Sequence, residues 1–166
     1  VLKNFDDLLH LPYFMGTEKA GTIEAAILGV EKGVKWVKYC LDYYTERPFI
    51  KQDGNMDIRK LPEIMVDEIQ KKMPIRYLTN MKLRDIEKLD FNKEIIVMPD
   101  EFFSPKVFDS REVLITPNTY TIHHYQNSWF SPKAKLYYRT RSLLIRIFGY
   151  NLVRKVECIL FPKKFK

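Results

Sequence analysis

The stretch Ile23-Glu24-Ala25-Ala26-Ile27-Leu28-Gly29-Val30 decides the fold class, because it is an apolar run that leads directly into a helical pattern. Its small and apolar side chains are typical of a strand or of the entry to a helix. From Gly33 to Glu46 the apolar residues recur at helical spacing, and Arg47-Pro48 ends that pattern, because a residue before proline is pushed out of the helical region. The sequence therefore predicts a strand or a helix entry over 23–30, followed by an amphipathic helix.

Similar alternations run along the rest of the chain. Short strands are predicted at 11–18, 95–98 and 120–122, and a helix at 61–72, where Pro62 is tolerated in the first turn. Residues 75–92 show little pattern, and 100–105 are predicted to be a loop. The residues from Pro132 to about Glu157 are predicted to be helical with a break near Gly149. This order indicates an α/β fold, with one domain over 1–130 and a helical tail over 131–166.

Positive charge is concentrated in the tail. The chain carries 28 basic and 21 acidic residues, a net charge of +7, and residues 131–166 hold ten of the basic residues and only Glu157 among the acids, a net charge of 10 − 1 = +9. Residues 1–130 are therefore near neutral, at 18 − 20 = −2. A basic appendage on a neutral body favours contact with an anionic surface over a nucleic-acid-binding body.

The predicted tail helix is amphipathic. Leu136, Leu143, Ile147 and Tyr150 form an apolar stripe, and we expect Lys133, Lys135, Arg139, Arg141 and Arg146 to face an anionic membrane surface. The alternative is a solvated helix face that packs on the body.

The two cysteines, Cys40 and Cys158, match no metal-binding or redox spacing, and Cys40 lies on the apolar stripe of the 33–46 helix as a buried free thiol. Without a disulfide framework, a signal peptide or a run of about 20 apolar residues, we expect a cytoplasmic protein, peripheral on the inner face of the membrane.

A cluster of polar groups follows the predicted strand at 120–122. It reads His123-His124-Tyr125-Gln126-Asn127-Ser128-Trp129 and contains two of the three histidines and one of the two tryptophans. Imidazole ligates metals, and Ser and Trp donate hydrogen bonds to anionic oxygen. Because side chains alternate along a strand, only one of His123 and His124 is expected to be a ligand. The competing interpretation is a strand end with structural histidines and a buried tryptophan.

At this segment the chain resembles glycosyltransferase family 32, which includes capsular polysaccharide synthesis proteins. The resemblance rests on the His-His-aromatic stretch followed by Ser128-Trp129. Other pieces are similar in the same order, namely Val1-Leu2-Lys3-Asn4-Phe5-Asp6-Asp7-Leu8-Leu9, Gly29-Val30-Glu31-Lys32-Gly33 and Val97-Met98-Pro99-Asp100-Glu101-Phe102-Phe103-Ser104-Pro105.

The resemblance implies a Rossmann-like enzyme that transfers a hexose from a nucleotide diphosphate sugar to a polysaccharide or lipid-linked glycan acceptor, with Mn²⁺ or Mg²⁺. It implies that His123 or His124 is a metal ligand and that Asn127, Ser128 and Trp129 bind the donor diphosphate. It assigns no catalytic residue. The family's metal-binding Asp-x-Asp would precede Val1, so the resemblance implies the C-terminal half of a catalytic domain, inactive alone. Glu24-Ala25-Ala26 departs from the family's pattern at the donor or acceptor side. The alternative function is a non-catalytic module that binds anionic membrane or nucleic acid through the tail.

Overall fold

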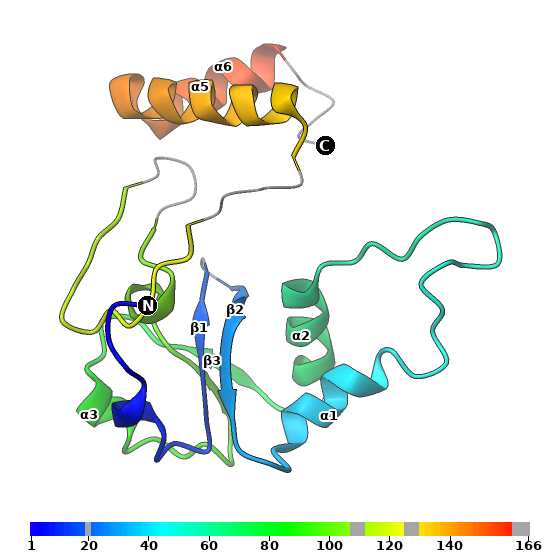
Figure 1. Cartoon of the computed structure of the whole chain (residues 1–166), viewed down its shortest axis with the longest axis vertical. Helices are drawn as coiled ribbons and strands as arrows, with labels where there is room; N and C mark the ends of the chain where they lie inside the picture. The colour runs from blue at the N-terminus through cyan, green and yellow to red at the C-terminus, as the bar shows by residue number, and fades with distance from the viewer. Residues whose placement is uncertain (19–20, 107–111, 125–129, 161–166) are drawn as a thin grey trace. The chain divides into compact units, whose positions relative to one another are not determined.

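The computed structural model describes residues 1–18, 21–106, 112–124 and 130–160 (Figure 1). The chain forms two compact units. The first contains Val1–Pro105 and Ile115–His123, and the second contains Lys106–Leu114 and His124–Lys166. The second unit therefore takes in a segment that precedes the predicted tail.

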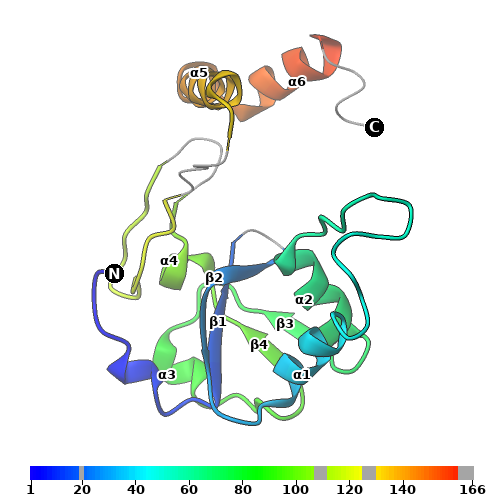
Figure 2. The ribbon, with the colours of Figure 1, turned by 45° about the vertical axis from the view of Figure 1, so that its right-hand side comes forward.

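The first unit is built on four short strands. β1 (Tyr13–Thr17) pairs antiparallel with β2 (Ile23–Val30), and β3 (Ile75–Tyr77) pairs parallel with β4 (Ile95–Val97). A bridge between Gly16 and Met98 joins the two pairs, because Thr17 N donates to Met98 O at 3.0 Å and Met98 N donates to Met15 O at 2.9 Å. This mixed arrangement with flanking helices confirms the α/β class (Figure 2).

One face of the strands is covered by the two predicted helices. α1 (Lys35–Asp42) and α2 (Leu61–Gln70) contact each other, and α2 contacts β2. Their buried side chains form a core with those of the strands: Tyr13, Met15, Ile23, Trp36, Cys40, Met65, Ile69, Ile95 and Val97. Both helices lie inside the predicted ranges, because their apolar stripes are long enough to mark a helix.

Several short elements of the first unit differ from the predictions. Residues 100–105, predicted as a loop, begin with helix α4 (Asp100–Phe103), which buries Phe102 and Phe103 completely. A single turn has no readable periodicity, and its stability comes from burying the two rings. Residues 75–92 form β3 and α3 (Leu83–Ile86), and a 3₁₀ turn spans Asp6–Leu8.

The predicted strand at 120–122 is wrong, because these residues have no ladder partner. They run as irregular chain beside α4, with Tyr120 N donating to Phe102 O at 2.7 Å.

Gly29 of β2 is required by a close contact. A Cβ atom at this position would lie 2.1 Å from the ring of Phe14, which is nearly fully buried on β1. Only glycine lets the ring cross the neighbouring strand at this distance.

The second unit contains a helical hairpin of α5 (Pro132–Phe148) and α6 (Tyr150–Leu160). Ser131 caps α5 by accepting a hydrogen bond from Ala134 N at 3.3 Å. Gly149, at φ +80°, separates the helices at the predicted break. In the described part of the chain, no helix combines the length and apolarity needed to cross a membrane.

Candidate functional site

The candidate site centres on a carboxylate buried in β2. Glu24 is only 2% exposed although its neighbours on the strand are apolar. Its Oε1 accepts a hydrogen bond from Ala26 N at 2.8 Å, and its Oε2 accepts one from the Ser104 hydroxyl and lies 3.1 Å from His123 Nδ1. Burying a charged carboxylate is costly without such partners, so these contacts make the position tolerable.

His123 is held by the chain that leads to it. Thr121 Oγ1 donates to Phe103 O at 2.8 Å, and Tyr120 stacks on Phe102 with ring centroids 6.2 Å apart. Burial, with the charge of Asp7, raises the pKa of Tyr120 to about 12, so this phenol stays protonated at neutral pH. The anchored segment sets the His123 imidazole against Glu24 while 37% of that side chain remains exposed.

The chemistry of the partners assigns the proton positions. An ionised Glu24 carboxylate would only accept hydrogen bonds, and beside it the protonated ring nitrogen of His123 would be Nδ1. Ser104 has one hydroxyl proton, and it is donated to the same oxygen. In a serine nucleophile system the hydroxyl bonds to the histidine and the histidine to the acid. Here the acid is central, so the arrangement orients His123 and does not activate Ser104.

A His–carboxylate pair of this kind is how proteins orient metal-binding imidazoles, since a carboxylate on one ring nitrogen sets the direction of the other. His123 therefore fits the role of a single metal ligand supported by Glu24. Within the four described segments, no group of three His, Cys, Asp or Glu side chains comes together that could hold a metal by itself.

The structure treats the two predicted histidines differently. His123 closes the first unit, and His124 belongs to the second, where its carbonyl oxygen accepts a hydrogen bond from Lys106 Nζ at 2.9 Å. The predicted diphosphate-binding residues Asn127, Ser128 and Trp129 lie outside the described residues. The prediction that only one histidine is a ligand stays a prediction, and the Glu24 contact favours His123.

Among the predicted membrane-facing residues, Lys133, Lys135, Arg139 and Arg146 are exposed. Arg141 is a correction, because its side chain is only 12% exposed and its Nε donates to Glu157 Oε1 at 2.7 Å. The positive charge of Arg141 is paired with a carboxylate inside the hairpin, so Arg141 no longer counts among the membrane-facing residues.

Sequence reasoning missed the roles of Glu24 and Ser104. The one available signal was a lone acid inside an apolar run at 23–30, since such a charge is buried only with partners. The partners themselves are 80 and 99 positions away, and no local pattern links them.

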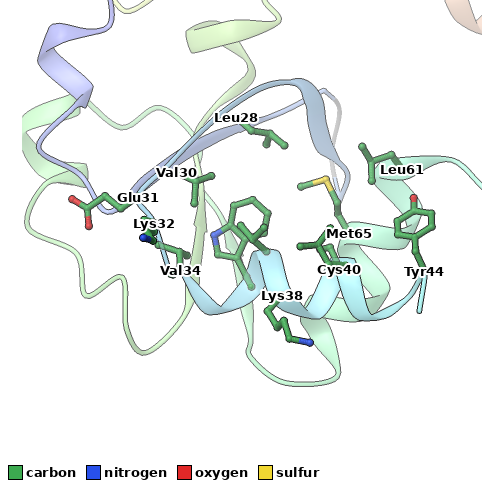
Figure 3. Close-up of a pocket in the computed structure, with 14 residues that line it drawn as sticks. Leu28, Val30, Glu31, Lys32, Val34, Lys38, Cys40, Tyr44, Leu61 and Met65 are labelled. Carbon is green, nitrogen blue, oxygen red and sulfur yellow. The ribbon is translucent and has the colours of Figure 1, made fainter. Parts of the chain in front are cut away.

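The first unit also contains a pocket of about 590 Å³ between β2, α1 and α2 (Figure 3). Leu28 and Val30 of β2 lie on one side of it and Cys40 and Met65 of the helices on the other. Burial, with the charge of Glu68, raises the pKa of the Cys40 thiol to about 11. The pocket thus has an apolar lining and an unreactive thiol, and it takes no side chain from the Glu24 site.

Comparisons with protein-family models, with curated proteins and with solved structures found no match to this chain.

Proposed function

We propose that this chain belongs to a metal-dependent glycosyltransferase that moves a hexose from a nucleotide diphosphate sugar to a polysaccharide or lipid-linked glycan acceptor. The observation that supports the proposal most is the 3.1 Å contact between the buried Glu24 and His123. It fixes the imidazole of the residue that precedes, in the sequence, the polar segment 124–129, whose residue types suit a diphosphate.

The chemistry requires groups that stabilise charge on the departing diphosphate. Breaking the sugar–phosphate bond places negative charge on those oxygens, and fixed donors and cations lower that barrier. In the proposal His123 would contribute one ligand to Mn²⁺ or Mg²⁺ and Glu24 would keep its ring in one tautomer. The resemblance assigns the phosphates to Asn127, Ser128 and Trp129, which lie outside the described residues. The ion supplies positive charge next to the diphosphate. The parallel pairs β3–β4 and Gly16–Met98 are compatible with the Rossmann-like fold that the proposal includes.

The test is metal-dependent binding of nucleotide to this chain. Titration with UDP and GDP, with and without Mn²⁺, is followed by calorimetry, and bound Mn²⁺ is counted by loss of its free electron-spin-resonance signal. We expect nucleotide binding that requires the ion. Glu24→Gln should weaken Mn²⁺ binding about 10- to 100-fold, as loss of a partner that orients a metal ligand does, and His123→Ala should weaken it at least as much.

The matched control is His10→Ala, which removes an exposed imidazole whose Nε2 lies 3.3 Å from Glu87. It should leave Mn²⁺ binding unchanged. Nucleotide binding that is absent, or indifferent to both Mn²⁺ and His123→Ala, would refute the proposal.

The proposed partner surface is an anionic membrane, where a lipid-linked acceptor would be found. The exposed Lys133, Lys135, Arg139 and Arg146 on α5 support it, at about 1 kcal/mol each near such a surface. Reversing these four charges to Glu should abolish co-sedimentation with anionic vesicles, and binding that survives the reversal ends this part of the proposal. Vesicle binding without any nucleotide binding would favour the alternative, a non-catalytic binding module.

A further inference from the structure

The α5–α6 hairpin encloses an apolar groove of about 460 Å³ between its two helices. Leu144 and Phe148 of α5 and Leu152 and Val156 of α6 line its length. The groove lies entirely within the second unit. Its volume falls in the range that small-molecule sites occupy, roughly 300–1,000 Å³.

Hydrophobic groups at the groove are left in water. Phe148 is 57% exposed and Leu152 is 52% exposed, although both line it. Each would be stabilised by about 25 cal/mol for every Å² of apolar surface that a ligand covered. Contiguous exposed apolar surface of this kind marks a binding site more often than a random surface feature.

The net charge of the hairpin that carries the groove favours one sign of ligand. The hairpin residues 132–160 carry seven Lys or Arg and one acid, a net charge of 7 − 1 = +6. The one acid, Glu157, is already paired with Arg141, so the excess charge at the surface is positive. The complementary ligand is an anion that also carries a hydrocarbon chain.

One end of the groove is polar in character. Tyr137 OH and Arg141 Nε each donate to Glu157 Oε1 at 2.7 Å. Glu157 is only 7% exposed, and its second oxygen, Oε2, is buried without a hydrogen-bond partner in the described part of the chain. A buried unpaired acceptor of this kind calls for an explanation, and a ligand hydroxyl would supply one.

We propose that the groove between α5 and α6 holds the hydrocarbon chain of a single anionic lipid, with the lipid's polar head at the Glu157 end. This deepens the proposed membrane contact from attraction by surface charge to insertion of one chain between the helices. It does not depend on the transferase assignment, because no nucleotide-binding or metal-binding residue takes part.

The experiment uses a monomeric lipid, so that no bilayer is present. The full chain is titrated with single-chain myristoyl lysophosphatidylglycerol below its micelle concentration and followed by calorimetry. Parallel titrations use the zwitterionic lysophosphatidylcholine and glycerol phosphate, which is the head group alone. We expect the anionic lipid to bind, the zwitterionic lipid to bind about tenfold more weakly, and the head group not to bind.

The two decisive variants each add an indole ring to α6, one inside the groove and one outside it. Val156→Trp fills the groove and should weaken binding of the anionic lipid by about tenfold or more, since blocking two methylene groups alone is enough for that factor. Ile159→Trp places the same ring on α6 at an exposed position that does not line the groove, and it should change binding by less than about twofold. Val156→Thr removes apolar lining without adding bulk and should weaken binding about fivefold, which covers the case in which Val156→Trp does not fold.

Three results would overturn the inference. They are no binding of the anionic lipid, equal binding of the head group alone, or equal effects of Val156→Trp and Ile159→Trp in variants that keep wild-type helicity. The nucleotide titrations described above report separately on the transferase proposal. Groove variants should leave them unchanged, so failure of one proposal is distinguishable from failure of the other.

Discussion

His123 and Glu24 are 99 positions apart in the sequence, and His123 Nδ1 lies 3.1 Å from Glu24 Oε2. The carboxylate is almost fully buried, whereas the imidazole is partly exposed. The pair thus has one end in the core and one end at the surface. A buried carboxylate that orients a partly exposed histidine is better explained by a functional site than by its effect on stability. Replacing a buried ion pair with apolar groups often costs no stability.

The Glu24 contacts predict an unequal pair of substitutions. The Glu24 carboxylate is contacted by Ala26 N, the Ser104 hydroxyl and His123 Nδ1, the last two at Oε2. Glu24→Gln keeps the shape of the side chain but replaces the carboxylate with an amide. We expect a loss of about 1–3 kcal/mol in the free energy of unfolding. Glu87→Gln breaks the exposed contact with His10 and should cost less than about 1 kcal/mol. Urea denaturation of both variants checks this, and equal losses would show that the buried network contributes nothing special.

The Glu157 carboxylate predicts a pH dependence of stability. Burial alone would raise its pKa, but hydrogen bonds from Arg141 and Tyr137 and the guanidinium charge outweigh burial and hold the pKa below 4.5. A lowered folded-state pKa stabilises the fold above the unfolded value, and that contribution disappears as the pH falls through and below 4.5. The stability difference between wild type and Glu157→Gln should therefore shrink on acidification. Far-ultraviolet circular dichroism during denaturation measures it, and a constant difference would contradict the assignment.

The two thiols are expected to react at very different rates. Cys158 is exposed, whereas Cys40 is buried and has a pKa raised to about 11. Because the thiolate is the nucleophile, a disulfide reagent at mildly alkaline pH should modify Cys158 first and Cys40 at least about tenfold more slowly. Cys158→Ser should remove the fast phase and leave the slow one. Two equally fast phases would contradict the burial of Cys40.

The same thiol should make stability fall at high pH. The ordinary thiol pKa is 9.0 and the folded value is about 11, so the unfolded chain ionises first. The stability contributed by the protonated thiol is complete below pH 9 and is lost as the pH rises toward 11. Cys40→Ala should flatten this part of the pH profile, measured by urea denaturation, and an unchanged slope would rule the effect out.

The contact between Gly29 and Phe14 predicts coupling across β1 and β2. Gly29→Ala forces the Phe14 ring to move and should cost about 1–3 kcal/mol, as overpacking does. Phe14→Leu leaves room for the new methyl group, so the double variant should lose less stability than the sum of the two single variants. Strict additivity in denaturation experiments would show that the ring and the glycine do not constrain each other.

The sequence predicted the longer helices correctly and missed the shortest ones. α1, α2 and the break at Gly149 were predicted because an apolar stripe over two or more turns, or a glycine between two stripes, is a local signal. α4 was missed because its four residues are shorter than the pattern that would reveal them. The 120–122 segment has strand-like composition, but backbone hydrogen bonds join it to Phe102 of α4 and to Leu2 and Lys3 near the N-terminus, none of which lies in a strand. The β-propensity of a segment expresses only a preference, and the segment forms a strand only where another strand lies beside it.

The amino-acid sequence by itself determined the α/β class and the basic helical tail, because periodicity and charge are local properties, and it left His123 and His124 as equal candidates for a ligand. Only the tertiary structure decided that Ser104 and His123 both meet Glu24 and that Arg141 turns inward to Glu157. The reason is physical: a buried charge takes whichever partner the packed chain brings within hydrogen-bond distance, and that partner lies far away along the sequence.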